Sequence, residues 1–252
     1  MIFIKTQEQI NLLRVSNRLV AMTLGELSNY IAPGVTPLKL DRIAYEFIKD
    51  NEAEPAFLNY KGFPNSICVS VNDVAVHGVP TAKPLEDGDI VTIDCGVRQN
   101  GFCGDSAFTF AVGSISEKNQ EFVTAVRSAL EAAVNAVCEG VRLGTVGHLI
   151  QEKIERAGYS VIRELTGHGI GRELHEDPLI YNYGIEGSGT RLEAGMVIAI
   201  EPIASAGERH VRVSKDGFGI ETCDGSCTAH FEQTIVVEKN GANVLSVFDF
   251  LK

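Results

Sequence analysis

The chain has 252 residues, and its 22 Lys and Arg against 33 Asp and Glu give a formal net charge of −11. This acidic balance argues against a broad nucleic-acid interface, which requires clustered Lys and Arg. Hydrophobic residues make up 44% of the chain, which is typical of folded proteins, and no apolar run reaches the ~20 residues of a membrane helix. The start lacks a signal-peptide pattern and the six Cys are scattered, so we expect a cytoplasmic protein with reduced thiols and no membrane association.

Two helices are predicted at the start of the chain. Thr6 and Gln9 form a capping box, and the apolar residues that follow lie on one helical stripe until Pro33-Gly34 ends it. Thr36 then precedes Pro37, a helix cap followed by proline at the first helical position. We therefore expect one helix that runs to about residue 32 and a second that begins at residue 37.

The rest of the chain alternates between strands and helices, and the order repeats. Strands are predicted over residues 66–112, helices over 116–137 and 145–157, and strands with Gly-rich loops over 161–237. The stretch LEDGDIVTID, residues 85–94, resembles LEAGMVIAIE, residues 192–201, at an offset of 107. We expect an α+β fold in which residues 1–252 form one domain with two related halves, about 1–112 and 113–238. Chance similarity between two amphipathic strands is the alternative.

A predicted hairpin brings two carboxylates to one face. Asn100-Gly101 is a strong signal for a two-residue turn, and with these as central residues Asp94 lies opposite Ala107 while Asp105 lies opposite Gly96. Asp94 and Asp105 are then diagonal neighbours, about 7–8 Å apart at the backbone. Gly96 has no side chain and should leave space opposite Asp105. Two carboxylates that converge in this way need a proton or a cation between them.

The second half supplies matching acids. Glu201 ends an apolar strand, Glu232 interrupts another, and His168 lies among Gly-rich turns. Each acid taken alone is more typical of a solvated strand end. Because four carboxylates and one imidazole occur at repeat-related places, we predict a dinuclear site for Mn²⁺, Fe²⁺ or Co²⁺.

Five stretches carry a family resemblance that runs from the first helix to about residue 237. The stretches are SICVSVNDVAVHGVP, VTIDCGV with GDSAF, LTGHGIGRELHEDP, AIEPI and HFEQT. They resemble the signatures of the type I methionine aminopeptidases, a family with the pita-bread fold, in which two pseudo-twofold halves place antiparallel sheet under helices. By resemblance the metal ligands are Asp94, Asp105, His168, Glu201 and Glu232.

The resemblance also implies an activity, which is removal of the N-terminal initiator methionine from nascent proteins. Two divalent ions (Co, Mn, Fe or Zn) would generate a hydroxide that attacks the first peptide bond. By resemblance Glu201 acts as general base and acid, and His175 bonds the carbonyl oxygen as its charge develops. His77 would contact the substrate backbone and the departing amide nitrogen.

An apolar pocket for the methionine side chain is also implied. Its wall would include Tyr60, Phe63, Cys68 and Phe218, each of which could equally be an ordinary core residue. Cys68 has no patterned base partner, so we expect it to line the pocket rather than act as a nucleophile. The chain departs from the family pattern at Cys103, Phe218 and His230. His230 shares the face of Glu232, so tuning of the metals could differ.

Two other functions compete with this one. A prolidase or aminopeptidase P shares the fold but usually carries an extra N-terminal domain, for which 252 residues leave no room. A pita-bread binding module without catalysis typically lacks several of the five ligands, which are intact here. The partners we expect are nascent chains that begin with Met, with ribosome association through the basic segment 209–215, and the protein should be a monomer.

Overall fold

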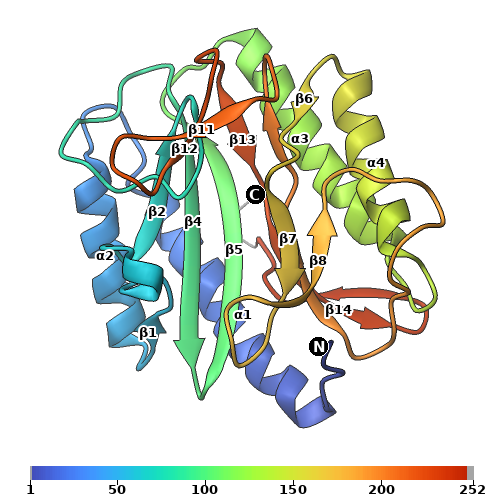
Figure 1. Cartoon of the computed structure of the whole chain (residues 1–252). Helices are drawn as coiled ribbons and strands as arrows, with labels where there is room; N and C mark the ends of the chain where they lie inside the picture. The colour runs from blue at the N-terminus through green and yellow to red at the C-terminus, as the bar shows by residue number, and fades with distance from the viewer. Residues whose placement is uncertain (1, 249–252) are drawn as a thin grey trace.

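The computed structural model describes residues 2–248 and confirms the α+β class. Figure 1 shows the helices in two pairs, with α1 and α2 beside the strands of the first half and α3 and α4 beside those of the second. Their bounds are α1 (Gln7–Ser28), α2 (Pro37–Asp50), α3 (Glu117–Ala136) and α4 (Leu143–Arg156). Within residues 2–248, every helix is too short or too polar to cross a membrane.

The predicted helix starts at α1 and α2 are confirmed. The Thr6 side chain accepts a hydrogen bond from the Gln9 backbone N–H, and the Gln9 side chain accepts one from the Thr6 N–H. Helix α2 is capped by Thr36. Helix α1 ends at Ser28, earlier than expected, because the Asn29 side chain donates to the carbonyls of the last turn and closes it. Helix α4 begins two residues before the predicted start.

All strand pairs within the named sheets are antiparallel. The first large sheet contains β1 (Glu54–Pro55), β2 (Ile67–Val71), β4 (Ile90–Gln99) and β5 (Phe102–Ala111). The second runs in the order β15 (Gly241–Val244), β14 (Gln233–Glu238), β9 (Val197–Ile200), β7 (Thr166–Gly169) and β8 (Glu176–Tyr181). Two small sheets complete the fold within the described residues. One has the order β13 (Thr228–His230), β10 (Ile203–Ser205) and β6 (Ser160–Val161). The other has the order β11 (Val211–Val213), β12 (Ile220–Thr222) and β3 (Val74–Val76).

The β4–β5 hairpin has the predicted register. Asn100 and Gly101 both have positive φ, 52° and 77°, as a type I′ turn requires. Asp94 pairs with Ala107 and Gly96 with Asp105, which confirms the diagonal relationship of the two acids.

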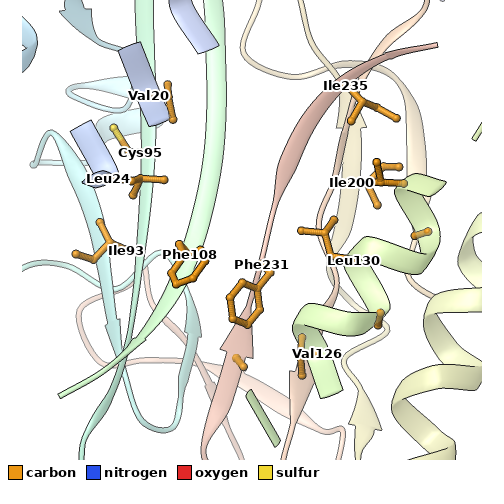
Figure 2. Packing of buried hydrophobic residues seen from close by; sticks show 14 of the residues in the cluster. Val20, Leu24, Ile93, Cys95, Phe108, Val126, Leu130, Ile200, Phe231 and Ile235 are labelled. Carbon is orange, nitrogen blue, oxygen red and sulfur yellow. The ribbon is translucent and has the colours of Figure 1, made fainter. Parts of the chain in front are cut away.

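The hydrophobic core fills the space between the sheets and their helices. Leu24 of α1 packs on β4, and Leu130 of α3 belongs to the same buried cluster on the other side. Figure 2 shows Phe108 of β5 and Phe231 between these two sides. Their ring centroids are 4.9 Å apart in an edge-to-face arrangement. One continuous core therefore joins the two halves, and Phe231 anchors the segment that connects β13 with β14.

Candidate metal centre and substrate cavity

Two acids of the candidate centre come from the first half. Asp94 on β4 is partly buried, and Asp105 on β5 is only 4% exposed. The Asp105 backbone N–H donates to the Asn17 side chain of α1, and its carbonyl accepts from the Thr234 hydroxyl of β14. The hairpin is thereby held against both a helix of its own half and a strand of the other half.

Glu232 comes from the second half but is fastened to β5. Its backbone N–H donates to the Ala107 carbonyl, and the Ser106 hydroxyl donates to its carbonyl. Because side chains alternate along an extended segment, Phe231 enters the core while Glu232 and His230 face the opposite way. Glu232 is 2% exposed and lies beside Asp105 as a result.

His168 and Glu201 complete the cluster. His168 pairs with Ala199 of β9, and Glu201 follows that strand directly. The Nε2 atom of His168 is 3.7 Å from Asp105 Oδ2 and 3.6 Å from Glu201 Oε1. His168 Nδ1 lies 2.9 Å from the Gly169 carbonyl, which can only accept, so the proton is on Nδ1 and the Nε2 lone pair faces the carboxylates.

The side chains of this cluster fit a divalent cation. Ligand atoms of Asp105, His168 and Glu232 lie within 4.8 Å of one another. One oxygen each of Asp94, Asp105 and Glu232 is buried without a hydrogen-bond partner. Within residues 2–248, no Lys or Arg forms an ion pair with these acids.

The ionisation of the acids supports the same conclusion. Burial raises the pKa of Asp94 to about 7. Burial, followed by the charges of neighbouring carboxylates, raises the pKa values of Asp105, Glu201 and Glu232 well above their ordinary range. Burial lowers the pKa of His168 to about 4, so this imidazole brings no positive charge at neutral pH. These acids can all be ionised at neutral pH only if positive charge lies among them, and a bound cation would supply it.

The cluster lies in a cavity of about 300 Å³. All eleven residues that the sequence singled out line it, which are Tyr60, Phe63, Cys68, His77, Asp94, Asp105, His168, His175, Glu201, Phe218 and Glu232. Phe63 and Phe218 form an edge-to-face pair with centroids 5.6 Å apart. Burial, followed by the charges of Asp94 and Asp105, raises the pKa of the Cys68 thiol, which agrees with a wall residue and not with a thiolate nucleophile.

Two histidines lie at the more exposed side of the cavity. His175 stacks on Tyr60 with centroids 5.4 Å apart, and its Nδ1 lies 2.9 Å from the Tyr60 hydroxyl. Burial and the nearby His168 lower the pKa of His175 to about 3. His77 follows β3 with a left-handed φ of 57°. Outside the cavity His210 is exposed, and His148 is partly exposed.

The sequence missed several residues of the cavity. Phe57, Lys61, Val76, Leu174 and Gly217 also line it, and so does His230, which the sequence assigns to the face of Glu232. The expected space opposite Asp105 is filled, because a Cβ on Gly96 would lie 2.4 Å from the ring of Phe57. Phe57 lies in the segment between β1 and the short 3₁₀ helix η1 (Tyr60–Gly62), a region without a periodic pattern that could have signalled it.

A cavity that joins a buried acid cluster with an apolar wall is typical of a metal-dependent enzyme. Residues 11–239 match metallopeptidase family M24, and the chain belongs to this family.

Similar proteins extend this result. Methionine aminopeptidase 1 of Bacillus subtilis (strain 168) is 44% identical over 246 residues, which are 98% of this chain and 99% of that protein. The crystal structure of methionine aminopeptidase from Rickettsia prowazekii matches with a TM-score of 0.96 at 40% identity, over 98% of this chain and 100% of that one. Prolidase from Pyrococcus furiosus gives a TM-score of 0.78 at 27% identity, over 97% of this chain and 65% of that one. The predicted pita-bread fold and the resemblance to methionine aminopeptidases are thereby confirmed.

Proposed function

We propose that the protein removes the N-terminal methionine from polypeptides by metal-dependent hydrolysis of the first peptide bond. The proposal is carried by one observation: a single cavity contains both an apolar wall and a cluster of acids with buried oxygens that lack hydrogen-bond partners. The wall of Phe63, Phe218 and Cys68 suits a thioether side chain, which gains affinity from dispersion and sulfur–aromatic contacts. Relatives that are 40–44% identical over nearly the whole chain carry the name methionine aminopeptidase.

The metal-holding residues in this proposal are Asp94, Asp105, His168, Glu201 and Glu232. Asp105, His168 and Glu232, whose ligand atoms lie within 4.8 Å of one another, would hold the ions together with Asp94 and Glu201. A pair of divalent ions, Co, Mn, Fe or Zn, supplies an activated water nucleophile and a positive charge for the oxygens of the scissile carbonyl.

The remaining steps belong to side chains of the cavity. Glu201 takes the proton of the attacking water and passes it to the departing amine. The Tyr60 hydroxyl lies 2.9 Å from His175 Nδ1. In this proposal the hydroxyl donates to Nδ1, so Nε2 carries the proton and donates to the carbonyl oxygen as negative charge develops. His77, at the same side of the cavity, contacts the substrate backbone and the departing nitrogen.

We also propose that one catalytic unit contains two related halves, about 1–112 and 113–238. Helices α2 and α4 both have 14 residues and begin at positions 37 and 143. Strands β4 and β9 begin at positions 90 and 197, and each leads to an acid of the cluster, Asp94 and Glu201. These offsets of 106 and 107 support a pseudo-twofold relation between the halves.

The proposed setting is the cytoplasm, where a monomer acts on nascent chains with a small second residue near the ribosome. The basic segment 209–215 gives ribosome contact limited support, because two of its arginines already face acids of the protein itself. Arg212 pairs with Glu221 at 2.8 Å, and Arg209 lies 4.0 Å from Glu164. The proposal therefore rests on substrate chemistry and not on a docking surface.

A peptide panel tests the activity. With Mn²⁺ or Co²⁺ present, Met-Ala-Ser should be cleaved faster than Met-Lys-Ser, and Gly-Pro-Ala should not be cleaved. Preferential cleavage of Gly-Pro-Ala would move the protein to the prolidase or aminopeptidase P group. A purified protein that binds no divalent ion and cleaves none of the peptides would instead be a binding module.

A further inference from the structure

His230 is a buried histidine whose ring has no hydrogen-bond partner. It is 1% exposed, and both Nδ1 and Nε2 lack a partner. A buried polar group in this condition is costly unless something outside the protein chain satisfies it. His230 lines the same cavity as the acid cluster but belongs to none of the roles assigned above.

The backbone around His230 fixes where its ring points. Its N–H donates to the Thr109 hydroxyl at 2.9 Å, and the same hydroxyl donates to its carbonyl at 2.8 Å. The next residue, Phe231, is held in the aromatic core against Phe108. Figure 2 shows Phe231 in that core. Because neighbouring side chains alternate, the imidazole of His230 is held on the side of the acids.

The spacing of His230 matches that of His168. His230 Nε2 is 3.6 Å from Glu201 Oε2 and 3.9 Å from Glu232 Oε2. His168 Nε2 lies 3.7 Å from Asp105 and 3.6 Å from Glu201. These distances are too long for good hydrogen bonds. They are close to the separation of about 3.0–3.4 Å between two ligand atoms that share one ion at about 2.1 Å each.

We propose that His230 is a sixth protein ligand of the metal centre and binds an ion through Nε2 beside Glu201 and Glu232. Glu201 would then lie between two ligating imidazoles, one at each of its oxygens. A second nitrogen ligand favours Co²⁺ or Zn²⁺ relative to Mn²⁺, which prefers oxygen donors. This inference rests on the proposed metal centre and adds a ligand to it.

The wild-type protein itself provides the first test. In Co²⁺-loaded protein, proton NMR detects the ring N–H of each ligating histidine as a shifted signal that disappears in D₂O. Two such signals are expected, from His168 and His230, and the His230→Gln variant should lose one. A single signal in the wild type would overturn the inference.

Metal affinity provides the second test. Isothermal titration should show that His230→Gln raises the dissociation constants for Co²⁺ and Zn²⁺. The factor of this increase should be at least roughly 10 times the factor for Mn²⁺. His210→Gln, a matched change at an exposed histidine, should alter neither affinity. Equal effects on all three metals would overturn the inference.

The two proposals fail in different ways. Wild-type protein that binds divalent metal and releases methionine, but gives one histidine signal, contradicts only the role of His230. Wild-type protein that binds no divalent metal at this centre contradicts the proposed function as well.

Discussion

Asp94 and Asp105 lie diagonally across the β4–β5 hairpin, because Asp94 pairs with Ala107 and Asp105 pairs with Gly96. The turn at Asn100-Gly101 sets this register, so residues at the far end of the hairpin decide where the two acids meet. Their charges raise the cost of keeping both ionised, which makes the pair dependent on a cation.

The first prediction concerns Asp94. Asp94→Asn removes a charge from the metal-binding set but keeps the size of the side chain, so kcat/KM for Met-Ala-Ser should fall by roughly 100-fold or more. The circular dichroism spectrum should stay unchanged because the amide removes a repulsive charge and no core contact. Asp50→Asn, at an exposed end of α2, is the matched control and should be fully active. An active Asp94→Asn enzyme would exclude the ligand role.

The second prediction concerns the orientation of His175. Tyr60→Phe removes the hydroxyl that lies 2.9 Å from His175 Nδ1 but keeps the stacked ring. We expect kcat to fall about 5-fold with little change in KM, because one hydrogen bond contributes about 1 kcal/mol. Steady-state kinetics measure the split. Tyr45→Phe on the exposed face of α2 serves as the control, and equal kcat values for both variants would contradict the role of Tyr60.

The third prediction concerns metal removal and pH. The pKa of Asp94 is raised to about 7 in the folded protein, and those of Asp105 and Glu232 are raised well above their ordinary range by burial and by like charges. A raised carboxyl pKa means that the folded state binds the proton more tightly than the unfolded state. Stability from these groups is therefore present at low pH and is lost as pH rises through the folded pKa.

Metal-free protein should accordingly lose roughly 1 kcal/mol or more of unfolding free energy per pH unit between about pH 6 and 8. Added Mn²⁺ or Co²⁺ should raise stability most at the higher pH, because the ions replace the protons. Urea unfolding at several pH values measures both effects. Metal-free protein that becomes more stable across this range would contradict the assignment.

The fourth prediction concerns a buried ion pair next to His175. Lys5 and Glu176 form a salt bridge, and their side chains are 6% and 9% exposed. Ile2 also forms a bridge with Asp177, so the N-terminal segment holds the loop that carries His175. Lys5→Met should cost about 3–5 kcal/mol, because it leaves the Glu176 charge buried and unpaired.

The double variant Lys5→Met with Glu176→Gln should recover much of that loss, because no unpaired charge remains. Urea denaturation of the single and double variants measures the difference. If Lys5→Met alone is as stable as the wild type, the ion pair does not hold this loop.

Local patterns predicted much of the fold and the candidate site. The capping box at Thr6, the turn at Asn100-Gly101 and the period of two in β4 are short-range signals, and each gave the correct element or register. The positions of the four acids followed from the same strand arguments. Resemblance then indicated the wall residues, such as Phe63 and Phe218, which no local pattern distinguishes from ordinary core.

The remaining features depend on contacts between distant segments. The sequence predicts open space at Gly96 opposite Asp105, but the ring of Phe57, from an irregular segment, occupies it. The sequence puts His230 on the face of Glu232, but its approach to Glu201 depends on the pairing of β13 with β10, the strand that follows Glu201. The early end of α1 reflects side-chain capping by Asn29, whose two bonds compete with continuation of the helix.

Methionine release from Met-Ala-Ser, measured while metal is returned to chelator-treated protein, tests the central claim most directly. We predict no free methionine without metal, and a rate that rises with added Mn²⁺ or Co²⁺ and levels off near two equivalents per chain. Methionine release by fully metal-free protein, or none at any metal concentration, would contradict the proposed function.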